Sequence, residues 1–343
     1  IPAIMEQHDV QHLFCHERFD PYGISLHQIL ENHLGKERFH SYNGKLLWHP
    51  NEIHKNDGTP YRVFTPFYRK GCLQFGPLPR LPLPLTKPTK YASIKDSTSL
   101  EALSLLPNKP WGKEITQYWD ISEAGAHKRL DTFIANKLTG YKVLRDFPGL
   151  GHTSKLSPFL RWGMISVNSI WDKLSSLEQI PPKDLDHFKS ELGWREFSYY
   201  LLHHFPKMTT ENLNPNFDHF PWHEDPALLK AWQQGQTGFP IIDAAMRQLY
   251  ATGYMHNRLR MVVGSFLVKN LTLHWHNGQD WFWDCLFDAD IANNSAGWQW
   301  IAGCGADAAP YFRIFNPILQ AQKFDKDGIF IHQWVPELSK LPP

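Results

Sequence analysis

The sequence has little of what marks several large classes of protein. Its 35 basic side chains nearly balance its 34 acidic ones, so the net charge of +1 does not indicate a nucleic-acid partner, and any such contact needs a local basic surface. Four cysteines are scattered without a CxxC pair or metal-ligand spacing: Cys15, Cys72, Cys285 and Cys304. Because no signal peptide is visible either, we expect a reducing, cytoplasmic compartment.

Long hydrophobic runs and short binding signatures are also missing. The longest apolar run, at 261–268, is far too short to span a bilayer, so we expect no membrane segment. The chain has no GxGxxG motif and no HExxH motif, which argues against a dinucleotide fingerprint and against a zinc site of that kind. What is abundant is tryptophan, with 14 residues, and core packing explains about half of them.

The chain is long enough, at 343 residues, for two domains with a large core. Residues 1–75 mix short apolar runs with turn residues, and we predict a strand at 10–14 and a helix at 24–34. This suits one piece of an α/β domain. Residues 76–110 are rich in proline, which predicts an extended linker. The first residue, Ile1, and the final Leu-Pro-Pro suggest cuts through a larger protein.

Residues 111–343 have a helical pattern and no convincing strand, so the fold class is α/β plus all-α. Six stretches carry apolar residues at helical spacing: 124–138, 158–174, 185–204, 226–234, 240–252 and 257–274.

Hydroxyl side chains precede the helix that Pro158 opens. Thr153, Ser154 and Ser157 lie in a Gly-containing loop that follows Tyr141, and free N–H groups at a helix N-terminus suit a phosphate or pyrophosphate. The alternative is plain N-capping by Ser157, which the residues alone favour.

Two further helices combine polar and apolar side chains on one face. Phe188, Glu191 and Arg195 share one face of the first helix. If this face is exposed, Glu191 and Arg195 form an ordinary ion pair. If it is partly buried, the carboxylate of Glu191 could hydrogen-bond a planar polar ligand. One turn apart, Asn257 and Met261 suit the edge and the face of a base. The alternative for the second helix is an amphipathic surface helix with solvated arginines.

The segment from Asp288 to Trp300 places two acids, an amide and two tryptophans among small residues. Asp288 and Asp290 could cap a helix or bind a metal ion. Because no third carboxylate lies at suitable spacing, a metal is not expected. The residues alone therefore predict a buried polar and aromatic site.

Taken together, these stretches resemble the DNA photolyase and cryptochrome family over nearly the whole chain. The resemblance is most specific at 194–197 (Trp-Arg-Glu-Phe), 237–247, 255–261, 297–300 (Gly-Trp-Gln-Trp) and 308–317, and is greatest to bacterial class I cyclobutane pyrimidine dimer photolyases. It implies an incomplete N-terminal α/β (Rossmann-like) antenna domain over 1–75, a linker over 76–110 and a large all-helical FAD-binding catalytic domain over 111–343. About the first quarter of a full-length relative is missing.

The resemblance implies light-driven repair by electron transfer from reduced FAD to a flipped-out dimer. Asp288 is expected to pair with Arg260 beside the isoalloxazine, and Asn294 to face flavin N5. Phe188 replaces a tryptophan that is common in relatives. The full set of FAD contacts carried over is Tyr141, Thr153, Ser154, Lys155, Leu156, Ser157, Phe188, Arg195, Arg260, Asp288, Ala289, Asp290 and Asn294.

For the lesion, the resemblance implies aromatic walls and few polar anchors. The pocket residues are Glu191, Trp194, Asn257, Met261 and Trp300, with Glu191 stabilising the dimer radical anion. The residues that hold the DNA strand are Arg145, Arg258, Arg313 and Gln320. An electron relay is implied for Trp222, Trp275 and Trp298. Met261 and Asn257 match the dimer enzymes and not the (6-4) enzymes.

Some expectations about partners follow as well. The partner would be UV-damaged DNA, the protein a monomer without membrane contact, and the location a bacterial cytoplasm in association with the nucleoid. An antenna chromophore, a folate or a deazaflavin, remains open because Tyr22 and Gly23 depart from the folate-binding pattern. The alternative function is a cryptochrome-like blue-light photoreceptor that binds FAD without repair, and Asn294 favours repair.

Overall fold

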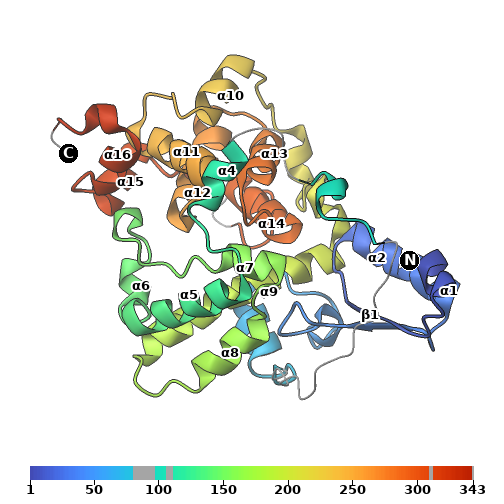
Figure 1. Cartoon of the computed structure of the whole chain (residues 1–343). Coiled ribbons are helices and arrows are strands. Elements are labelled where there is room, and N and C mark those ends of the chain that lie inside the picture. Colours follow the sequence, from blue (N-terminus) through green and yellow to red (C-terminus); the bar gives the residue numbers. More distant parts are fainter. Residues whose placement is uncertain (80–96, 106–110, 309–311, 342–343) are drawn as a thin grey trace.

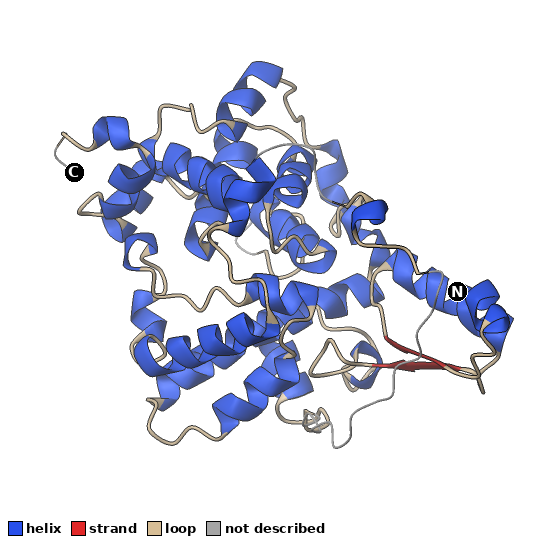
Figure 2. Ribbon diagram, in the orientation of Figure 1, coloured by secondary structure: helices blue, strands red, loops and turns tan. Residues whose placement is uncertain are grey.

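The computed structural model describes residues 1–79, 97–105, 111–308 and 312–341, without the side chains of Trp111 and Lys113. Within this part the protein is helical, and two short strands lie near the N-terminus (Figure 2). Most of the predicted linker at 76–110 lies outside the described residues, so its extended form stays a prediction. No helix among the described residues is both long enough and apolar enough to cross a membrane.

The N-terminal segment is a small α/β unit. Strand β1 (Leu13–His16) pairs in parallel with β2 (Phe39–Tyr42), and α2 (Pro21–Leu34) makes the crossover that parallel strands require. A short helix, α1 (Pro2–Gln7), packs on α2. The strand prediction at 10–14 was placed three residues too early. Arg38 donates to the carbonyls of Val10 and Gln11, at 2.8 and 3.1 Å, so these groups do not join the ladder.

A first group of helices surrounds one long helix. Its members are α5 (Glu123–Asn136), α6 (Tyr141–Leu144), α7 (Ser157–Trp162), α8 (Val167–Ser175) and α9 (Pro182–His204). The short helix α4 (Trp111–Thr116) precedes them in the chain and packs on α11 (Pro240–Thr252) of the second group. The single helix predicted at 158–174 is wrong. Gly163 adopts a φ of 74°, which ends α7, and the Ser166 hydroxyl then accepts from Ser169 N to begin α8.

A second group of helices follows. Its members are α10 (Pro226–Gln233), α11 (Pro240–Thr252), α12 (Asn257–Ser265), α13 (Trp275–Cys285), α14 (Ile291–Ala302), α15 (Pro317–Phe324) and α16 (Ile329–Trp334). The single helix predicted at 257–274 is wrong at its C-terminal end. A π-helical turn, Phe266–Asn270, continues α12, Thr272 has a φ of 54°, and His274 caps α13 through its side chain. The sequence also did not predict helices α13 to α16.

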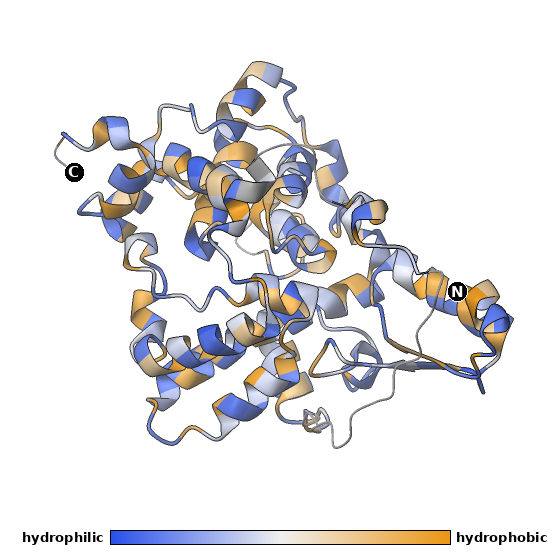
Figure 3. Ribbon diagram, viewed as in Figure 1, coloured by the Kyte–Doolittle hydropathy of each residue, from blue (hydrophilic) through white to orange (hydrophobic). Residues whose placement is uncertain are grey.

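Two hydrophobic cores divide the molecule. One joins α5 to α9 with residues 46–72 of the N-terminal segment, and the other joins α10 to α14 with α16. Figure 1 shows the green helices of the first core beside the yellow-to-red helices of the second. Orange, hydrophobic segments lie where the second group packs together (Figure 3). Between residues 111 and 341, the described residues contain no strand pairing beyond an isolated bridge between His223 and Leu273.

Helices α13 and α14 approach closely at Gly278. A Cβ atom at this position would lie only 2.1 Å from Cη2 of Trp298, so glycine is required for the indole to lie on the helix backbone. Trp298 is buried at 2% exposure, against Phe282 and Trp232. This close approach therefore fixes the position of one indole in the second core.

The substitution Gly278→Ala should destabilise the protein. The new methyl group must displace a buried ring, and overpacking of this kind costs about 1–3 kcal/mol. Gly297→Ala is the matched control because its Cβ meets no described atom within 4 Å and it lies inside α14. That change should be neutral or stabilise by up to about 1 kcal/mol. Urea unfolding of the FAD-free chain measures both, and equal effects of the two alanines would contradict this packing.

Candidate functional site

A cavity of about 550 Å³ lies between the two cores. This volume falls in the range of about 300–1,000 Å³ that is usual for small-molecule sites. Most of its lining comes from four segments: residues 153–161, the middle of α9, the start of α12, and residues 288–301. Segments far apart in the sequence thus meet around one cavity, which the side chains of neither core fill.

The structure brings most of the predicted site residues together in this cavity. All thirteen predicted FAD contacts line it: Tyr141, Thr153, Ser154, Lys155, Leu156, Ser157, Phe188, Arg195, Arg260, Asp288, Ala289, Asp290 and Asn294. So do seven of the lesion, DNA and relay residues, namely Arg145, Glu191, Trp194, Asn257, Met261, Trp298 and Trp300. Outside the described lining lie Trp222, Trp275, Arg258, Arg313 and Gln320.

The loop before α7 is not closed by a capping side chain. The residue at the N-cap is Leu156, and no side chain in the described part of the chain bonds the first turn, so capping by Ser157 is wrong. Lys155 has a φ of 52°, a conformation that is uncommon for residues other than glycine. Thr153 Oγ1 lies 3.2 Å from Tyr254 Oη. Hydroxyls and a helix N-terminus thus face the cavity, which suits a phosphate group.

Two carboxylates that line the cavity are buried and hydrogen-bonded. Both oxygens of Asp288 accept from Arg260, at 3.0 and 2.8 Å, which confirms the predicted pair. Asp290 accepts from the backbone and side chain of Asn293, at 2.9 and 2.7 Å, and from the Tyr199 hydroxyl. Burial would raise the pKa of Asp290, but nearby Lys45 and these hydrogen bonds outweigh it, so the pKa lies below its ordinary value.

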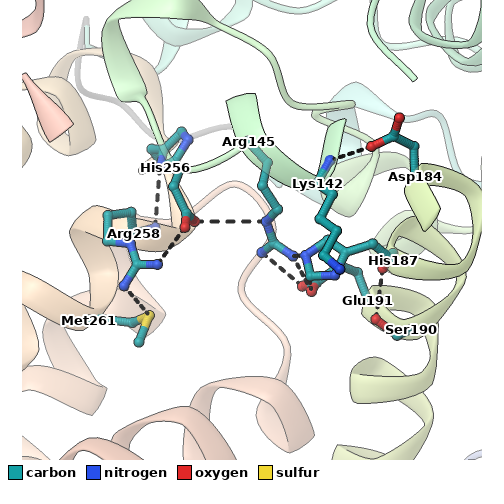
Figure 4. Close-up of polar contacts among 10 residues, drawn as sticks. Lys142, Arg145, Asp184, His187, Ser190, Glu191, His256, Arg258 and Met261 are labelled. Carbon is teal, nitrogen blue, oxygen red and sulfur yellow. Dashed lines mark hydrogen bonds and ion pairs between the residues drawn. The ribbon is translucent and has the colours of Figure 1, made fainter. Parts of the chain in front are cut away.

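At the mouth of the cavity Glu191 pairs with Arg145, as Figure 4 shows. Arg145 Nη2 donates to Glu191 at 3.0 Å, and Nη1 lies 3.1 Å from His187 Nε2. The ion pair between Glu191 and Arg195 is therefore wrong. Arg195 donates instead to the buried Glu196 at 2.9 Å. Arg145 is only 9% exposed, so burial makes Glu191 its compensating charge.

The predicted DNA-strand residues differ in their surroundings. Arg258, which Figure 4 labels, donates to Asp146 at 2.7 Å. Its guanidinium also lies 4.5 Å from the Phe324 ring centroid. Arg313 is exposed, and Gln320 is half-buried. A phosphate could thus meet Arg313 directly, whereas Arg258 would have to share its charge with Asp146.

An aromatic path leads outward from the cavity. Gly278, which supports the Trp298 ring, lies one turn after Trp275 on α13. His274 stacks on Trp275 with ring centroids 5.8 Å apart and meets Trp222 edge-on at 5.1 Å. Trp222 is half-buried, whereas Trp298 and Trp275 are buried. The relay through Trp298, Trp275 and Trp222 stays a prediction.

Sequence reasoning missed several residues of this site. Tyr199 and Tyr254 line the cavity, and Arg161 donates to the carbonyl of Ala289 at 2.5 Å. Tyr199 is one turn after Arg195, which is a signal that the sequence offered. For Lys45 there was no such signal, because its partner Asp290 lies 245 positions away in the sequence.

The site and fold together define a helical protein with a cavity that suits a nucleotide-type cofactor and that tryptophan residues line. Two family models match: DNA photolyase over residues 1–87 and the FAD-binding domain of DNA photolyase over residues 188–343. A deoxyribodipyrimidine photo-lyase of Agrobacterium fabrum is 45% identical over 329 residues, which are 94% of this chain and 68% of that relative.

Two solved structures are also similar. A bacterial class III photolyase from Agrobacterium tumefaciens has a TM-score of 0.90 at 43% identity, and covers 99% of this chain with 71% of its own. An archaeal photolyase from Sulfolobus tokodaii with two FAD molecules has a TM-score of 0.80 at 30% identity, over 96% of this chain and 70% of its own. The chain belongs to the DNA photolyase family and carries its FAD-binding domain. Assignment to class I stays a prediction.

The buried His256 makes the site sensitive to acid. Its Nδ1 accepts from Arg258 N at 3.1 Å and so caps α12. Burial lowers the pKa of His256 to about 4. Between pH 6.5 and 4 the unfolded chain binds a proton here and the folded chain does not, so stability is lost as the pH falls, by up to about 3 kcal/mol.

His256→Asn should flatten this pH dependence, because asparagine keeps a capping oxygen but does not ionise. Urea unfolding at pH 7 and pH 4.5 measures the difference. The same change at His54, an exposed loop residue, is the control. It should leave the loss of stability between pH 7 and pH 4.5 unchanged. If His256→Asn loses as much stability at pH 4.5 as the wild-type chain does, other groups cause the pH dependence.

Proposed function

We propose that this protein is a light-driven deoxyribodipyrimidine photo-lyase that repairs cyclobutane pyrimidine dimers. The observation that carries the proposal is the cavity, where a diphosphate-type loop, two buried acids and two tryptophan walls meet. The identity of 45% with the Agrobacterium fabrum enzyme supports it. The relatives are longer than this chain, which spans about two thirds of their length.

The residues of the cavity fit FAD in chemical type. Hydroxyls and amides of residues 153–157 would hold the diphosphate, and Phe188 with Tyr141 would form an apolar wall. The acids Asp288 and Asp290 would accept from ring N–H groups, with Asn294 nearby. Bound reduced FAD would supply, under blue light, the electron that opens the cyclobutane ring.

A flipped dimer would enter at the open side of the cavity. Trp194 is stacked on Phe64 with ring centroids 3.8 Å apart, so one face is covered and the indole is held in place. The Trp300 Nε1 donates to the carbonyl of Asp307 at 2.9 Å, which fixes the second wall. Asn257 is exposed at the mouth, and Arg145 holds Glu191 where it would meet a base.

We propose the division into residues 1–75, 76–110 and 111–343, a monomer, and an intracellular site of action on UV-damaged DNA. A second light-harvesting cofactor is in keeping with the relative that holds two FAD molecules. Exposed Arg313 would contact the strand beside the lesion, together with Arg258 and Gln320.

Repair is tested with oligonucleotides that contain a single defined lesion. The purified chain with chemically reduced FAD should restore the cyclobutane dimer under blue light and leave a (6-4) product unrepaired. Binding should weaken as salt rises, since phosphate contacts release counterions. Stable FAD binding without restoration in light would favour the photoreceptor alternative and defeat the repair proposal.

The aromatic path predicts separate behaviour for photoreduction and repair. Trp298→Phe should slow light-driven reduction of bound oxidised FAD by at least about tenfold, because phenylalanine oxidises far less readily at the same place in the path. Repair by chemically pre-reduced protein should be nearly unchanged. Trp283→Phe, at an exposed position on α13, is the control. Equal loss of both activities in Trp298→Phe would refute the relay.

A further inference from the structure

Lys45 of the N-terminal segment lies close to two residues that line the cavity, Asp290 and Tyr199. Its Nζ lies 3.9 Å from Asp290 Oδ2 and 4.7 Å from the centroid of the Tyr199 ring. Lys45 is not among the described residues that line the cavity, whereas its neighbours Asp290 and Tyr199 are. The ammonium group thus lies behind the carboxylate that we assign to the flavin.

The backbone around Lys45 is held by hydrogen bonds from two sides. Asn43 Oδ1 accepts from the amides of Lys45 and Leu46, at 3.2 and 2.9 Å, and its Nδ2 donates to the Leu46 carbonyl. Glu196 of α9 accepts from Leu47 N at 2.7 Å and from Trp48 N at 3.3 Å. These hydrogen bonds hold the backbone of the turn that carries Lys45. The fixed backbone directs the lysine side chain toward Asp290.

The same glutamate links this turn to the cavity. Glu196 also accepts from Arg195, which lines the cavity one residue earlier on α9. A Cβ at Gly44 would lie 2.0 Å from the His16 ring, so the turn also packs closely on β1. The N-terminal segment is therefore attached to the cofactor wall through this turn.

Lys45 stands among charges of both signs. The charged groups that act on it are Asp290, Arg195, Arg161 and Asp20. The pKa of Lys45 is lowered to about 8, chiefly by burial, with Arg195 and Arg161 also lowering it and Asp290 raising it. Burial of a charged lysine costs free energy, so a partly buried lysine with a lowered pKa is more common where its charge has a function. Its charge offsets that of Asp290, while Glu196 offsets that of Arg195, so Arg161 adds a further positive charge near this wall.

We propose that Lys45 is a positioning residue that acts through Asp290 to favour the anionic, reduced state of the flavin over the oxidised state. The inference rests on the proposed function, because it takes the flavin to lie against Asp290. The N-terminal segment thereby tunes the cofactor and is not only a support for an antenna.

The test compares the affinity of the chain for reduced and for oxidised FAD, measured anaerobically by fluorescence titration. Lys45→Met should weaken binding of reduced FAD about tenfold more than binding of oxidised FAD, since one nearby positive charge is lost. For a two-electron couple this ratio equals a fall in midpoint potential of about 30 mV. Lys45→Arg keeps the charge and should restore most of the difference.

Lys36→Met is the matched control, because it removes the same charge from an 88% exposed side chain of the same segment. It should leave both affinities unchanged, as solvent and salt screen that position. Equal weakening of both forms of FAD in Lys45→Met, including complete loss of both, would show a merely structural role and overturn the inference. So would unchanged affinities. Failure of the wild-type chain to bind FAD would instead defeat the proposed function.

Discussion

The buried carboxylate of Glu196 is the interaction on which the arrangement of the site depends. It is 2% exposed and accepts from Arg195 and from the amides of Leu47 and Trp48. Burial raises the pKa of Glu196 to about 7, although Arg195 and the two amides lower it. These donors offset part of the cost of burying the carboxylate. Removal of one donor would leave a buried polar group unpaired. Through this carboxylate, helix α9 fixes the N-terminal segment on one side and directs Arg195 into the cavity on the other.

The rest of the site follows from two cores that do not merge. Each core packs its own helices, and the cavity remains where the loop before α7, α9, α12 and α14 meet. Such a cavity between helices lets polar groups face a ligand while apolar residues behind them fix their positions. Gly278 illustrates the second point, because the absence of a side chain there lets the Trp298 indole, which lines the cavity, pack on α13. Membership of the DNA photolyase family gives this arrangement a cofactor, FAD.

Local sequence signals were sufficient to predict helices whose first turn is marked by a capping residue or a proline. Helices with a clear start were predicted well, such as α10, where Asp225 caps the first turn, and α11, which Pro240 opens. The errors came where a local backbone feature interrupts an apolar pattern, as at Gly163 and at Thr272. Periodicity continues through such points, whereas the helix does not. The pairing of Glu191 was also wrong, because its partner Arg145 is 46 positions away and spacing along one helix cannot show it.

The sequence by itself determined the class of fold, the family and the residues that the cavity gathers, because motifs record which side chain types a cofactor needs. The pair of Arg260 and Asp288 belongs to this part, since the resemblance implied it. Tertiary structure alone decided the charges around those residues. It turned Glu191 to Arg145, left the start of α7 uncapped, and brought Lys45 behind Asp290. Burial and long-range packing set these contacts, and neither can be read from spacing along a chain.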